Sequence, residues 1–160
     1  MALITATTKV ITDYEHRPLN DDILKFKEPV ILKGLVNQWN IVEKGRQSDE
    51  HAIDYLKSHY NGKLSNACIG PTDIKGRFFY NSDYTELNYD SRKMRVDEVL
   101  DLIRDTFDKN NAESYYIASN VINTHFPNFQ SENELIIPRP DSDVPLDDLR
   151  VSIWIGSKTT

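Results

Sequence analysis

The feature that most constrains the fold is the run RVSIWIG at residues 150–156, in which aliphatic residues alternate with others. Because successive side chains of a strand point to opposite faces, Val151, Ile153 and Ile155 share one face. Trp154 lies on the other face. A period of two predicts a half-buried strand. We expect its aliphatic face to need a second sheet, since a strand without one would leave an apolar face and an open edge.

The rest of the chain predicts two amphipathic helices and several short strands. One helix lies between an N-cap at Ser48 and a stop at Gly62, and the other covers about 96–108, where apolar residues recur at helical spacing. A helical turn that buries a tryptophan is predicted at 35–40, and strands at 28–34, 66–70, 77–81 and 114–119. Strands outnumber helices and no GxGxxG follows a strand, so we expect an α+β, mainly β, domain on an antiparallel sheet.

Composition argues against two classes of partner. The net charge is −6, and no long Lys/Arg cluster is present, so a nucleic-acid footprint is not expected. No apolar run approaches the roughly 18 residues that cross a bilayer, so no membrane span is expected. The single cysteine, Cys68, allows no internal disulfide, which favours a reducing, cytoplasmic setting.

The residues alone identify no catalytic centre. An iron site often uses two strand residues in a His-x-Asp or His-x-Glu pair. No histidine here has an acid two residues on, in the set His16, His51, His59 and His125. GxSxG and GxxxxGK[ST] are also absent. Glu50 and Asp54 share a helix face with a histidine, which is best explained as a solvated surface.

Four stretches together resemble one family. They are EPVILKGLVNQWN, GRFFYNSDYTELNY, YYIASNVINTHFPNFQSENEL and VSIWIGSKTT, and they span residues 28–160. In this order they resemble bacterial cupin-like JmjC domains, a branch of the Fe(II)/2-oxoglutarate oxygenases. Each match alone is weak, and the shared order makes the resemblance specific.

The resemblance implies the N-terminal portion of a double-stranded β-helix, or jelly roll, with helical elaborations. Residues 1–148 would be an N-terminal elaboration and residues 149–160 the first core strand, with the domain truncated at Thr160. The family's His-x-Asp iron motif would follow directly after that residue. Fe(II) and 2-oxoglutarate are therefore implied for the complete domain, and no tightly bound iron is expected in this chain alone.

The resemblance also supplies candidate site residues. Tyr116 occupies the register of a family tyrosine that reaches the 2-oxoglutarate carboxylate, with Ile117 on the opposite face. A core tyrosine bonded to backbone is an equal alternative. Further pocket candidates, of lower rank, are Ala118, Ser119, Asn120, Asn133 and Trp154. For the serine and the two asparagines, loop capping is the better explanation of the residue type, and Trp154 is better explained as a packing residue. No catalytic or metal-binding residue is predicted within the chain.

Two functions follow from the resemblance. The first is an oxygenase that hydroxylates a protein side chain or a small molecule. The second is a non-catalytic cupin-like binding or interaction module. Neither predicts a nucleic-acid or membrane partner, and a homodimer is compatible with both.

Overall fold

An antiparallel four-stranded sheet in the order β4-β3-β5-β6 is the main sheet of the protein. The structure is a computed structural model, which describes residues 8–15, 19–135 and 150–157. The strands of the sheet are β3 (Leu64–Gly70), β4 (Asp90–Arg95), β5 (Ser114–Val121) and β6 (Ser152–Gly156). Since β5 pairs with both β3 and β6, it is a central strand of this sheet.

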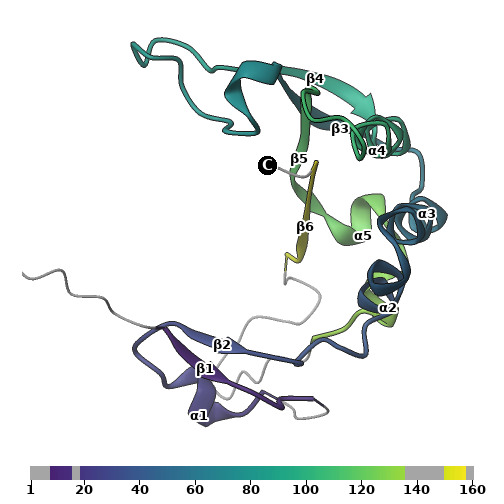
Figure 1. The fold of residues 1–160 in the computed structure, drawn as a ribbon. Coiled ribbons are helices and arrows are strands. Elements are labelled where there is room, and N and C mark those ends of the chain that lie inside the picture. The colour runs from purple at the N-terminus through teal and green to yellow at the C-terminus, as the bar shows by residue number, and fades with distance from the viewer. Residues whose placement is uncertain (1–7, 16–18, 136–149, 158–160) are drawn as a thin grey trace, which may run out of the picture.

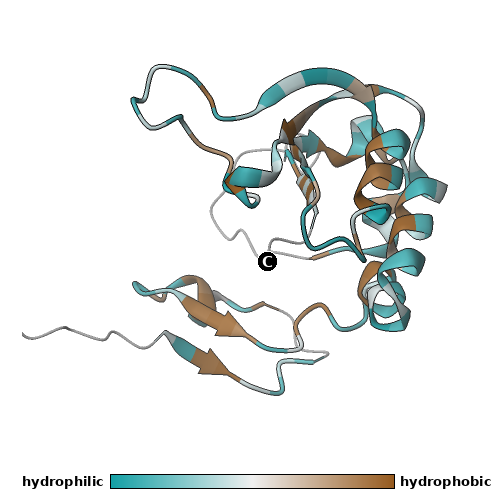
Figure 2. Ribbon diagram, turned by 45° about the horizontal axis from the view of Figure 1, so that its top comes forward, coloured by the Kyte–Doolittle hydropathy of each residue, from teal (hydrophilic) through white to brown (hydrophobic). Residues whose placement is uncertain are grey.

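Helices cover one face of the main sheet (Figure 1). They are α3 (Asp49–His59), α4 (Val96–Arg104), α5 (Ile122–His125) and α6 (Phe129–Glu132). Their apolar faces meet the strands in one core, and Figure 2 shows hydrophobic residues gathered between helices and sheet. The largest fully buried side chains are Phe126, Leu100, Ile117, Val96 and Val99. Burying each such side chain contributes about 1.5–3 kcal/mol, so this one-sided packing organises the fold.

The remaining elements form a second, smaller part. Strands β1 (Lys9–Ile11) and β2 (Val30–Leu32) pair in parallel, with α1 (Asp21–Leu24) between them. Helix α2 (Asn40–Gln47) leads from this part to the main sheet. A short 3-10 helix, η1 (Thr72–Ile74), follows β3. In Figure 1 the ribbon is an open C, with the β1/β2 pair at one end and the chain between η1 and β4 at the other. No helix in the described part of the chain is long and apolar enough to cross a membrane.

The two predicted helices are present. The Ser48 hydroxyl caps α3 by accepting the backbone N–H of His51 at 3.1 Å. Helix α4 ends at Arg104, earlier than predicted, because residues 105–108 form turns. Helix α2 was not expected at its observed length, since it has no buried residue and contains Gly45.

The prediction of a strand at 77–81 is wrong. Only Tyr80 makes an isolated bridge, to Leu87. The side chain of Asn81 accepts the backbone N–H groups of Thr85 and Glu86, which bends the chain into a turn. Asparagine side chains often compete in this way with the backbone hydrogen bonds of a β-sheet.

The final strand forms as predicted, but its two faces differ from expectation. Ile153 and Ile155 pack against the helix-covered core, not against a second sheet. Val151 precedes the strand and is 38% exposed. The opposite face is the open one, because Trp154 is 60% exposed. The stretch PRPDSDVPLDD at 138–148, whose prolines and acids predict a surface loop, lies outside the described residues.

Buried Asn133 fixes α6 to α2 and α3. Its carbonyl oxygen accepts the backbone N–H of Ile41 at 2.9 Å, in the first turn of α2. Its amide donates to the Tyr55 hydroxyl at 2.9 Å and to the Phe129 carbonyl at 2.8 Å. The residue at the N-cap of α2, Trp39, offers no side-chain cap. Asn133 therefore accepts a backbone N–H in the first turn of α2 that the N-cap side chain leaves without a partner.

Replacement of Asn133 by alanine should lower the free energy of unfolding by about 2–3 kcal/mol, because three hydrogen bonds are lost in a buried place. Urea denaturation followed by circular dichroism measures the change. Asn123→Ala is the control, since this exposed asparagine in α5 should change stability by less than about 0.5 kcal/mol. Equal effects of the two substitutions would contradict the capping role.

Candidate functional site

The face of the main sheet that the helices leave uncovered carries Tyr116. In the strand register, Tyr116 is opposite Cys68 on one side and Gly156 on the other, so the three residues share a face. Its neighbour Ile117 points the other way and is 0% exposed in the core. The alternation predicted for this strand is therefore confirmed, and Tyr116 lies half-buried on the open side.

Aromatic rings surround Tyr116 on this face. The ring of Phe78 stacks on it, with centroids 5.6 Å apart and planes at 29°. Tyr89 meets Phe78 edge-on at 5.3 Å, and Trp154 lies 6.1 Å from Tyr116. Such ring pairs are favourable beyond the area they bury. The result is a row of four aromatic side chains that runs across the sheet.

Two glycines make room for this row. A Cβ at Gly156 would lie 3.1 Å from Cδ2 of Tyr116, so the bare backbone lets the tyrosine ring lie over β6. A Cβ at Gly70 would clash with Cδ1 of Ile74 and lie 3.1 Å from Cε1 of Phe78. Without a side chain at Gly70, the segment after β3 can fold back and bring Phe78 onto Tyr116.

A pocket of 430 Å³ opens beside the Tyr116 ring. It is lined by Gly76, Arg77, Phe78, Tyr115, Tyr116, Gly156 and Ser157. The hydroxyl of Tyr116 makes no hydrogen bond with any described residue, although the ring is half-buried. A phenol donor, an arginine and apolar rings together suit a small carboxylate with an aliphatic body.

The neighbouring tyrosine behaves differently. The hydroxyl of Tyr115 donates to Glu113 at 2.8 Å. Burial, and then the bond to this carboxylate, raise the pKa of Tyr115 to about 12. Tyr115 therefore stays neutral and already has a partner, whereas the Tyr116 hydroxyl remains available. Burial also raises the pKa of the Cys68 thiol, so this cysteine is not set up as a thiolate nucleophile.

A family model for the cupin-like domain matches residues 16–160. The chain belongs to the cupin-like domain family. A comparison with curated proteins found no match. The helices and antiparallel sheet of this cupin-like chain are consistent with a jelly-roll architecture.

The structure brings only two of the predicted site residues together, Tyr116 and Trp154. Ala118 and Ser119 are exposed where the register shifts between β5 and β6, and Ser119 has a positive φ of 51°. Asn120 is buried and accepts a hydrogen bond from Ser65. Asn133 belongs to the α2–α3–α6 junction described above. The assignment of the set to one pocket stays a prediction.

Sequence reasoning missed several residues of this pocket. Phe78 and Arg77 come from the segment predicted as a strand, and Gly156 and Ser157 from the end of β6. Gly156 could have been found, because a glycine inside a strand often marks a close approach by another group. Nothing local indicates that Phe78 folds back onto β5.

The described residues do not fit an iron centre. They contain no group of three or more His, Cys, Asp or Glu side chains that could hold a metal ion. The Tyr116 pocket offers a phenol donor and an arginine.

Gly156→Ala should displace the Tyr116 ring and lower stability by about 1–3 kcal/mol, because the added methyl overpacks the ring contact. The near-ultraviolet circular dichroism of the aromatic row should change with it. Gly45→Ala is the matched control: it lies in α2 with nothing within 4 Å of an added Cβ, and should raise stability by up to about 1 kcal/mol. An unchanged aromatic spectrum in Gly156→Ala would contradict the packing described here.

Proposed function

We propose that this cupin-like protein is an Fe(II)- and 2-oxoglutarate-dependent oxygenase and that Tyr116 binds a carboxylate of 2-oxoglutarate. The observation that carries the proposal is the Tyr116 hydroxyl, which has no partner among the described residues and lies at a pocket on the open face of the sheet. In a cupin-like domain this face would be one inner wall of a double-stranded β-helix, with the other sheet opposite.

The surroundings of Tyr116 support a carboxylate ligand. Phe78 and Trp154 hold the phenol ring from two sides, so its O–H has a restricted direction. A hydrogen bond from the phenol to a charged carboxylate is stronger than one to a neutral acceptor. Arg77 lines the same pocket and adds a positive charge. These residues would bind and orient 2-oxoglutarate.

Iron would supply the activation of O₂ in such an enzyme. The described residues provide no ligand set for it, so we assign no step to the metal. The substrate would be a C–H group of a protein side chain or of a small molecule. The single cysteine is compatible with a cytoplasmic protein, and a homodimer is compatible with the proposal.

Tyr116→Phe should weaken 2-oxoglutarate binding about tenfold, because it removes one hydrogen bond to a charged group and leaves the ring in place. Calorimetric titration of the protein with 2-oxoglutarate, with divalent metal present and oxygen excluded, measures the affinity. Tyr84→Phe is the control: Tyr84 is 71% exposed and does not line the pocket, so its substitution should leave the affinity unchanged.

Two outcomes would separate the hypotheses. No binding of 2-oxoglutarate, or equal affinities for the native protein and Tyr116→Phe, would overturn the role of Tyr116. Binding without formation of succinate in the presence of iron and O₂ would select the non-catalytic cupin-like binding module.

A further inference from the structure

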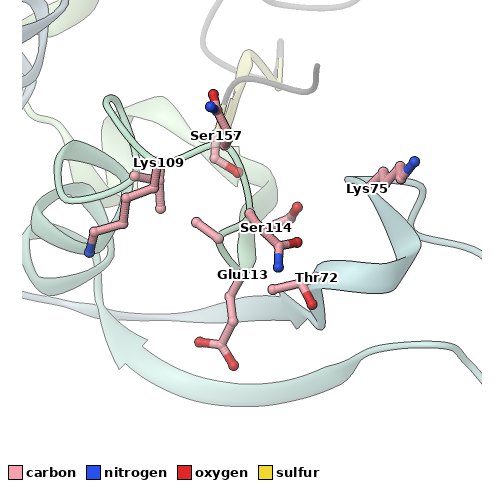
Figure 3. Close-up of a pocket in the computed structure, with 10 residues that line it drawn as sticks. Thr72, Lys75, Lys109, Glu113, Ser114 and Ser157 are labelled. Atoms are coloured by element: carbon pink, nitrogen blue, oxygen red, sulfur yellow. The ribbon is translucent and has the colours of Figure 1, made fainter.

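A second pocket, of 230 Å³, lies where β5 begins and where β3 and β6 end (Figure 3). It is lined by Thr72, Lys75, Thr106, Lys109, Asn110, Asn111, Ala112, Glu113, Ser114 and Ser157. Only Ser157 also lines the Tyr116 pocket. Nearly all of its lining side chains are polar, in contrast to the aromatic row, so the two pockets suit different ligands.

Ser114 provides an unused donor in this pocket. The residue is 7% exposed, and its hydroxyl makes no hydrogen bond with any described residue. The Ser114 oxygen is not among the fully buried atoms that lack a partner, so it is open to the pocket. Because Ser114 lines the pocket, a ligand there is a natural acceptor for its O–H.

Two lysines stand at the rim with no carboxylate partner in the described part of the chain. Figure 3 shows Lys75 and Lys109 on opposite sides of Ser114, with their ammonium groups directed outward. Both are exposed and can turn toward a ligand through their flexible side chains. Glu113 is the one acid in the lining, and its carboxylate accepts the Tyr115 hydroxyl and points away from Ser114 and Ser157 in Figure 3.

Lys75 is the C-cap residue of η1, at the rim of the pocket. Lys75 has φ 48° and ψ 46°, the left-handed region in which glycine is less strained than any residue with a Cβ. The same conformation ends η1, because the Lys75 N–H bonds to the Thr72 carbonyl.

We propose that this pocket binds a phosphate-sized oxyanion, either inorganic phosphate or the phosphate group of a small molecule. The volume is below the roughly 300–1,000 Å³ of pockets for drug-sized ligands, so the pocket suits an anionic group and not a whole cofactor. Two ammonium groups and the Ser114 hydroxyl match the charge and the acceptor oxygens of phosphate. The proposal is independent of the oxygenase function.

An anion here would act on the end of β6. The hydroxyl of Ser157 accepts the backbone N–H of Tyr115 at 3.0 Å and so links β6 to β5. Since Ser157 lines both pockets, an oxyanion beside it would order the strand ends that also border the Tyr116 pocket.

Titration of the isotope-labelled protein with inorganic phosphate at constant ionic strength tests the proposal by NMR. Saturable shifts are expected at the amides of Ser114, Ser157 and Lys75. Ser114→Ala and Lys75→Gly should each weaken phosphate binding about fivefold, because each removes a donor to a charged ligand. Lys75→Gly should keep or raise thermal stability, because glycine relieves the left-handed backbone, so its lost affinity would not reflect unfolding.

Lys93→Ala is the matched control, because it removes the same charge from exposed β4, outside the pocket. It should leave phosphate affinity unchanged, as should Tyr116→Phe. A titration with glycerol 3-phosphate shows whether the ligand is free phosphate or a phosphorylated small molecule. Binding tighter than that of inorganic phosphate supports a phosphorylated small molecule. Equal or weaker binding supports the free ion. Shifts that do not saturate, or a loss of affinity in Lys93→Ala as large as in Lys75→Gly, would overturn the proposal.

Discussion

One-sided burial of the β3–β5–β6 sheet is the constraint on which the rest of the structure depends. Ile117 at the centre of β5 is completely buried between the neighbouring strands and the helices, with Leu100 and Phe126 in the same core. This packing sets the direction of every second residue on β5. Tyr116 must therefore face the uncovered side, where no helix competes with a ligand for its hydroxyl.

Two glycines shape the open face of the sheet as much as its aromatic side chains do. Gly70 lets the chain fold back, and Gly156 gives the Tyr116 ring a surface to lie on. Phe78 and Trp154 then hold this ring from both sides. A buried hydrophobic core thus positions a single polar atom with precision on the opposite face, which is what a binding site requires.

Local signals were enough to predict some parts of this fold. The cap at Ser48 and the apolar stripe of α4 act within one or two turns, so both helices could be found from sequence. The orientation of Tyr116 followed from strand alternation, and the cupin-like family from short motifs in a shared order. Strand β4 was not predicted, because its residues, DSRKMR, are largely exposed and lack an apolar alternation.

Other parts depend on contacts between distant residues. Asn133 caps a helix that lies 92 positions earlier in the chain, and no local pattern signals such a pairing. The turn formed by the side chain of Asn81 overrode an aromatic run that suits a strand. The Tyr116 pocket likewise combines segments around residues 76–78, 115–116 and 156–157, so its aromatic row became visible only in three dimensions.

We propose that 2-oxoglutarate lies against the ring of Tyr116. Isotope-filtered NMR of the protein with ¹³C-labelled 2-oxoglutarate tests it directly, because nuclear Overhauser effects report protons in close contact. We expect effects between the ligand methylene protons and the rings of Tyr116 and Phe78. A bound ligand that shows effects only to residues away from the aromatic row would contradict it.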